Sequence, residues 1–204
     1  MKKLFLSMLA AVTLFASCSQ EEIVTKTDGE SLVSFTVTTP ELGSRAVGDG
    51  TTAKNLYYAV YDAKGAIVST ISNNKGTAKK LDDKKATVSF PLLNGEKYSI
   101  LFWAEADVNA NKMATVDWDK KTLSVNPTAS NQETYDAFYA YVKEFVVTGD
   151  KNENVNLYRP FAQLNIGTTQ EDIDRVGKYF NGATFSNTQV QITNVPKSMS
   201  LATG

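Results

Sequence analysis

Short runs in which apolar and polar residues alternate constrain the fold of this chain more than any other feature. The first run places Val33, Phe35 and Val37 on one side, with serine and threonine between them. A period of two is that of a β-strand, so this run predicts a strand with one buried and one exposed face. Similar runs recur between turn-forming residues. Together they predict a mainly β protein, an antiparallel β-sandwich of roughly seven to nine short strands.

The other expected strands differ in how strongly the sequence marks them. The run 98–104 is apolar on both sides, which predicts a central strand covered on both faces. Residues 135–147 are ambiguous, because the first half has helical spacing and the second half looks extended. The remaining expected strands are 56–61 with a hairpin partner at 66–71, 88–92, 122–125, 161–167 and 188–195.

One short helix is predicted near the end of the chain. Thr168 and Glu171 have the spacing of a capping box, in which each side chain bonds a free backbone N–H of the first turn. Apolar residues then recur on one face at Ile173, Val176 and Phe180.

Composition excludes most enzyme chemistry. The 204 residues contain no histidine and one cysteine, which removes Ser-His-Asp and Cys-His sites, histidine-containing metal sites and intramolecular disulfides. The 21 basic and 22 acidic residues nearly cancel, so we expect no nucleic-acid partner. We therefore expect no cofactor, no metal and no enzymatic activity.

Acidic residues beside the two tryptophans are the remaining candidates for chemistry. Glu105 follows Trp103 closely, and Asp117 and Asp119 flank Trp118. Two facing carboxylates beside an aromatic platform would suit a glycosidase, but acidic residues at strand ends are usually solvated. The same tryptophans could instead contact a sugar by stacking, without hydrolysis, or simply pack in the core.

The first residues have the features of an export signal. Lys2 and Lys3 precede an apolar run, 4–15, that is shorter than the roughly 20 residues that a transmembrane helix needs. The small residues Ala16 and Ser17 then precede Cys18, the arrangement of a lipoprotein precursor, although a plain secretory signal is the alternative. We expect a signal peptide at 1–17, a lipid on Cys18, a polar tether at 18–31 and a β-sandwich domain at 32–195.

A glycine-rich loop, 41–52, follows the first predicted strand. It contains Arg45, one of three arginines in the chain, between Ser44 and Ala46. Loop tips with small residues are preferred sites of proteolysis, although on the sequence alone a merely solvated arginine is the favoured explanation.

Several segments together resemble the amino-terminal domain of the Bacteroidetes fimbrillins, or type V pilins. They are the acidic residues after the lipobox cysteine, the arginine loop, and the stretches 135–138, 157–167 and 194–196. The resemblance implies a Greek-key, transthyretin-like sandwich and export as a surface lipoprotein of the outer membrane. It further implies that an arginine-specific protease cuts between Arg45 and Ala46, and that the strand 33–37 is then lost. A donor strand from another pilin subunit would fill the groove, and the mature subunit would reside in the fimbrium.

Three functions stay open at this point. The chain is expected to be a structural subunit of a pilus with a role in adhesion, a pilus anchor or accessory subunit that keeps its first strand, or a surface lipoprotein that binds glycans. The last would use an exposed aromatic patch such as Trp103 or Trp118. Fimbrillins also carry a second domain, so residues 196–204 are expected to be the start of a missing domain or a truncated tail.

Overall fold

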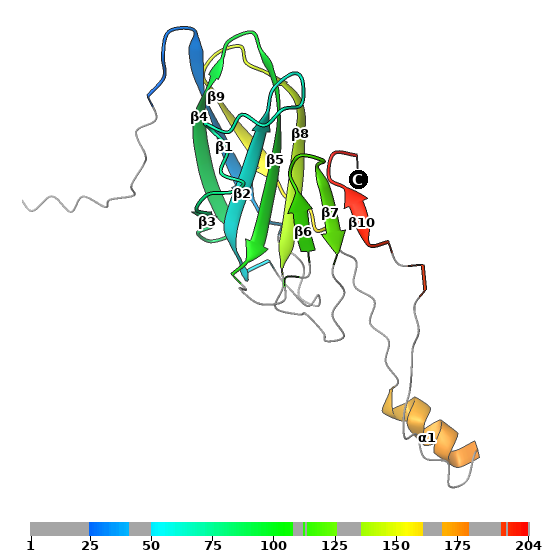
Figure 1. The fold of residues 1–204 in the computed structure, drawn as a ribbon. Helices are drawn as coiled ribbons and strands as arrows, with labels where there is room; N and C mark the ends of the chain where they lie inside the picture. The colour runs from blue at the N-terminus through cyan, green and yellow to red at the C-terminus, as the bar shows by residue number, and fades with distance from the viewer. Residues whose placement is uncertain are drawn as a thin grey trace, which may run out of the picture.

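The computed structural model describes residues 25–40, 50–107, 112, 114–125, 136–160, 169–179, 193–194 and 196–203. These residues form a mainly β protein with one short helix (Figure 1). The strands are β1 Glu30–Thr38, β2 Ala53–Tyr61, β3 Lys79–Lys80, β4 Lys85–Leu93, β5 Lys97–Ala106, β6 Ala114–Asp117, β7 Thr122–Val125, β8 Ala137–Val146, β9 Lys151–Asn156 and β10 Ser198–Ser200, and the helix is α1 Gln170–Tyr179.

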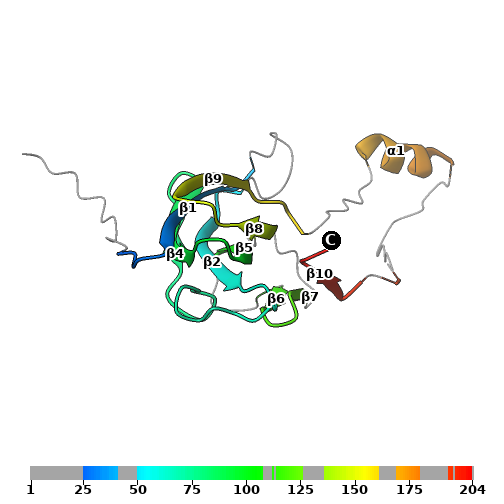
Figure 2. The same cartoon turned by 90° about the horizontal axis from the view of Figure 1, so that it is seen from above.

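The strands form three sheets, with the orders β4-β1-β9, β3-β2-β5-β8 and β10-β7-β6. Seen from above, β1 and β9 lie on one side of β2, β5 and β8, and β6 and β7 lie on the other (Figure 2). The predicted β-sandwich is confirmed. The prediction that it is antiparallel throughout needs one correction, because β1 pairs with β9 in parallel.

The middle sheet is apolar on both faces. On one face Ile100 and Phe102 of β5 join the core that the first sheet closes, together with Phe35 of β1. On the other face Leu101 and Trp103 of β5 join a second core with residues such as Leu123 of β7. The prediction of a central, doubly covered strand at 98–104 is therefore confirmed, and the physical cause is the alternation of side chains along β5.

The ambiguous stretch 135–147 is extended where the structure describes it. β8 runs from Ala137 to Val146 and pairs antiparallel with β5 along most of its length, so the helical spacing of its first half was misleading. The predicted hairpin partner at 66–71 is wrong only in its extent. After the turn at 62–65, Ile67 makes an isolated antiparallel bridge with Tyr61 and the Val68 N–H donates to the carbonyl of Val60, but no strand continues to residue 71.

Residues 198–201 pack on the described fold, and the expectation that 196–204 are the start of a missing domain or a truncated tail stays a prediction. β10 pairs antiparallel with β7, and the side chain of Leu201 is only 1% exposed within the second core. The strands predicted at 161–167 and 188–195 lie largely outside the described residues.

The predicted helix is confirmed, with its cap one residue later than expected. Thr169 and Asp172 exchange hydrogen bonds, in place of Thr168 and Glu171. None of its residues is buried, and Ile173 is 41% exposed. Among the described residues, no helix is long and apolar enough to cross a membrane.

Candidate functional site

β1 is the middle strand of its sheet, which makes it the most consequential element for the predicted function. Its neighbours are β4, antiparallel, and β9, parallel, and the two contact β1 rather than each other. Phe35 lies opposite Val88 on one side and Glu153 on the other. The predicted strand at 33–37 is thus confirmed as part of β1. Its removal by proteolysis stays a prediction.

The two faces of β1 have opposite character. Val33, Phe35 and Val37 are each 0% exposed and point into the first core. On the other face Ser34 and Thr36 contact Ser89 and Thr87 of β4 through their hydroxyl oxygens, at 2.7 and 3.3 Å. This pattern is the one that the alternation in sequence predicts.

Phe35 is the centre of the buried face. Its ring centroid lies 5.7 Å from that of Phe90, 5.6 Å from that of Phe102 and 5.5 Å from that of Phe145. These three rings come from β4, β5 and β8. A single side chain of β1 therefore joins the sheet β4-β1-β9 to the middle sheet, and aromatic pairs at such separations stabilise beyond the area that they bury.

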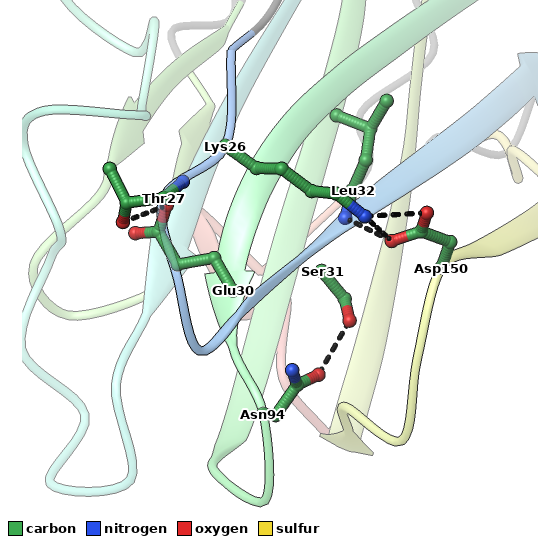
Figure 3. Close-up of polar contacts among 7 residues, drawn as sticks. All are labelled: Lys26, Thr27, Glu30, Ser31, Leu32, Asn94 and Asp150. Atoms are coloured by element: carbon green, nitrogen blue, oxygen red, sulfur yellow. Dashed lines mark hydrogen bonds and ion pairs between the residues drawn. The ribbon is translucent and has the colours of Figure 1, made fainter.

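The amino-terminal end of β1 is held by a clasp made of Lys26, Leu32 and Asp150. The ammonium of Lys26 lies 2.8 Å from both carboxylate oxygens of Asp150, and the Leu32 N–H donates to the same carboxylate at 2.8 Å (Figure 3). The Lys26 ammonium first, and the Leu32 N–H second, hold the pKa of Asp150 below its usual value.

Other contacts fix the residues just before the strand. The backbone N–H and the hydroxyl of Thr27 both donate to Glu30, which lowers the pKa of that carboxyl, and Ser31 donates to Asn94 (Figure 3). The predicted tether at 18–31 therefore needs correction at its end. β1 begins at Glu30, and residues 26–31 bind the domain because polar partners on neighbouring turns are in reach.

A buried carboxylate anchors the start of β2 beyond the arginine loop. Asp136 is 0% exposed and accepts bonds from the Gly50 N–H at 3.2 Å, the Thr52 hydroxyl at 2.7 Å and the Arg159 guanidinium at 2.8 Å. We call these four residues the Asp136 anchor. Gly50 has a φ of +82°, and a Cβ there would lie 3.4 Å from both the Phe138 ring and the Pro40 carbonyl, so the turn favours glycine.

The predicted processing site and lipidation site are not placed by the structure. Arg45, Ala46 and Cys18 lie outside the described residues. Sequence reasoning did not identify the Asp136 anchor, although Arg159 is one of only three arginines and stands within the stretch 157–167 singled out above.

A cavity of about 270 Å³ lies on the opposite face of the middle sheet, and both tryptophans line it. We call it the Trp103–Trp118 cavity. Trp103 is only 2% exposed, so the expectation that it forms an exposed patch is wrong: β5 carries it into the second core. Trp118, just after β6, is partly exposed. The other residues that line the cavity are Tyr57, Asn74, Lys75, Gly76, Glu105, Lys112, Ala114, Thr115 and Val116.

Three acidic residues near the tryptophans, Glu105, Asp107 and Asp117, have separate basic partners. Glu105 pairs with Lys112 and also accepts the indole N–H of Trp103 at 3.0 Å. Asp107 pairs with Lys80 at 3.4 Å. Asp117 pairs with Lys120 at 3.0 Å, and hydrogen bonds from Lys120 lower the pKa of its carboxyl. Each of these three carboxylates is thus engaged with a different lysine.

Three solved structures are similar to part of the chain. A candidate polysaccharide-binding protein (DUF1812) of Bacteroides thetaiotaomicron is 16% identical over 63% of this chain and 47% of its own, with a TM-score of 0.36. A fimbrial assembly protein of Parabacteroides distasonis is 15% identical over 64% and 52%, with a TM-score of 0.35. A candidate adhesin of Bacteroides ovatus is 12% identical over 64% and 46%, with a TM-score of 0.34.

The chain spans about half the length of these three proteins. A comparison with curated proteins finds no match. One family model matches residues 24–204, which include every strand described above, and the chain therefore belongs to that family, described as a family of unknown function (DUF6562).

Proposed function

We propose that this chain is a surface-exposed lipoprotein that serves as a structural subunit of a pilus, with a role in adhesion rather than catalysis. Cys18 carries the lipid that anchors the precursor to the outer membrane, and an arginine-specific protease cuts between Arg45 and Ala46. The chain then loses β1 and takes up a donor strand from another subunit. The resemblance to fimbrillins motivates this proposal, and the observation that carries it is the position of β1 between β4 and β9.

Loss of β1 would create an acceptor groove for a strand. Unpaired backbone groups of β4 and β9 would line it on both sides, and the sites of Val33, Phe35 and Val37 would form its apolar floor. Burial of three such side chains contributes roughly 5–9 kcal/mol, at about 1.5–3 kcal/mol each. A donor strand with the same alternation recovers both the main-chain bonds and this burial, which is the physical basis of strand addition.

The Asp136 anchor explains how β2 would stay in place after the cut. Gly50 and Thr52 lie beyond Ala46 in sequence, and both bind Asp136 rather than β1. A new amino terminus at Ala46 would therefore be only a few residues from a fixed point of the fold.

The test uses an arginine-specific protease on the folded chain carrying Arg175→Lys, because Arg175 is exposed on α1. Arg159 is followed by Pro160, a bond that such proteases cut poorly. Cleavage after Arg45 should release β1 only slowly, and a synthetic peptide of residues 30–38 should bind the stripped domain and restore its thermal stability. A control peptide with serine at 33, 35 and 37 should not. Equal binding of both peptides would contradict the proposal.

Processing in cells separates this function from that of an anchor or accessory subunit. Amino-terminal sequencing of surface material should find Ala46 for a pilin, and a blocked, acylated Cys18 for a subunit that keeps β1. The matched variant Arg45→Ala should fold normally, since surface substitutions usually change stability by less than about 0.5 kcal/mol, but it should not enter filaments. Its normal incorporation would rule out strand replacement.

A further inference from the structure

We propose that the Trp103–Trp118 cavity is a binding site for one pyranose ring of a glycan. The site lies on the face of the middle sheet opposite β1, among residues of the second core. It is separate from the acceptor groove and does not depend on strand exchange. The uncleaved chain can therefore test it, whatever the outcome of the assembly experiments.

The cavity has aromatic walls on rigid elements. Trp103 lies on β5, Tyr57 lies opposite it on the neighbouring strand β2, and Trp118 follows β6. The Tyr61 hydroxyl donates to the backbone carbonyl of Trp118 at 2.6 Å, which fixes the residue beside the cavity. Burial raises the pKa of the Tyr61 phenol, so this hydroxyl keeps its proton over the physiological range.

A buried donor in the wall needs an acceptor. The side-chain Nδ2 of Asn74 is buried and has no hydrogen-bond partner among the described residues. An unsatisfied buried polar group costs free energy, and each such group in a native structure calls for an explanation. Because Asn74 lines the cavity, an acceptor on a bound ligand supplies that explanation.

A buried carboxylate, already paired, lines the same cavity. The side chain of Glu105 is only 6% exposed, and its two carboxylate oxygens accept the Trp103 indole N–H and the Lys112 ammonium. The ion pair with Lys112 balances its charge, and a neutral ligand therefore suits the site.

A sugar ring matches this combination of groups. A hydroxyl oxygen accepts a hydrogen bond, so a sugar hydroxyl can pair with Asn74 without bringing an unpaired charge into the cavity. The C–H faces of a pyranose pack on indole and phenol rings. The volume of about 270 Å³ falls just below the range of roughly 300–1,000 Å³ for drug-sized ligands, which points to a single ring inside the cavity.

The two tryptophans make the site unusually easy to observe. They are the only two in the chain, so a ¹H–¹⁵N spectrum contains two indole signals, both from residues that line the cavity. The folded chain is titrated with the methyl glycosides of glucose, galactose, mannose and N-acetylglucosamine at millimolar concentration. At least one should shift both signals in a saturable way. Sorbitol, an open-chain polyol with no ring to stack, should not. Saturable shifts with sorbitol, or with none of the glycosides, would overturn the proposal.

Two variants and a matched control sharpen the test. Asn74→Ala removes a donor that no described residue uses, so it should keep the melting temperature and weaken sugar binding roughly tenfold. Trp118→Ala should abolish saturation at the remaining Trp103 signal. Tyr158→Ala, which removes an exposed aromatic residue outside the cavity, should bind the sugar as the unmodified chain does. Unchanged affinity in Asn74→Ala would overturn the assignment of this cavity.

Discussion

Truncation of Phe35 should weaken the sandwich more than any other single change in β1. The side chain is 0% exposed and contacts Phe90, Phe102 and Phe145. Phe35→Ala therefore removes a ring that joins the sheet of β1 to the middle sheet. Buried Phe→Ala substitutions destabilise by about 3–5 kcal/mol, from lost burial and the cavity left behind. Such a loss is a large part of the roughly 5–15 kcal/mol by which domains of this kind are stable.

Urea denaturation measures this effect, with an adjacent residue as control. At a slope of roughly 2 kcal/mol/M, the expected loss lowers the denaturation midpoint by roughly 2 M. Thr36→Ala changes the next residue of the same strand, whose side chain points to the opposite face and contacts Thr87. It should change stability by less than about 0.5 kcal/mol. Equal losses in the two variants would refute the conclusion that the inward face of β1 is what holds it.

Three further predictions follow from other contacts. Asp136→Asn should destabilise the domain by about 3 kcal/mol in urea denaturation, because it removes the charge of the buried partner of Arg159. The control Asp107→Asn, at an exposed ion pair, should change the free energy of unfolding by less than about 0.5 kcal/mol. The chemical shift of the Leu32 amide should follow the titration of Asp150, with a midpoint below pH 3.8, and Lys26→Gln should raise that midpoint. The clasp therefore stabilises the folded state fully above pH 3.8. Its contribution disappears as the pH falls through the lower pKa of Asp150 in the folded state. Cys18→Ser should abolish incorporation of radiolabelled palmitate, because the chain has no other thiol, and continued labelling would contradict the lipid anchor.

The strands that sequence predicts best are those whose side chains alternate cleanly. β1 and β4 alternate, and apart from Ser31 every buried position in them carries an apolar residue, so the period of two is visible without the fold. β9 was missed because only Val155 of its six residues is apolar and buried. Its place comes from main-chain pairing with β1 at the edge of the sheet, where charged side chains are favoured, and no local pattern encodes that pairing.

The two sites were predictable to different degrees. Val33, Phe35 and Val37 came directly from alternation, because strand, face and burial are all local consequences of one pattern. The Trp103–Trp118 cavity did not, because its walls come from four separate parts of the chain. Both tryptophans were candidates, but nothing in the sequence indicated that Asn74, in a polar loop, would lie with them. A long-range meeting of that kind depends on how the sheets pack.

The central strand β5 explains how one domain can keep both sites independent. Phe102 faces the first core and contacts Phe35, whereas the next residue, Trp103, faces the second core and the cavity. Because successive side chains point to opposite faces, loss or exchange of β1 changes what Phe102 contacts and leaves Trp103 with the same neighbours. β5 is in turn held by β2 and β8 on either side, and neither belongs to the sheet of β1. Under the proposed strand exchange, the opposite face of the middle sheet would therefore keep the geometry that the proposed sugar site needs.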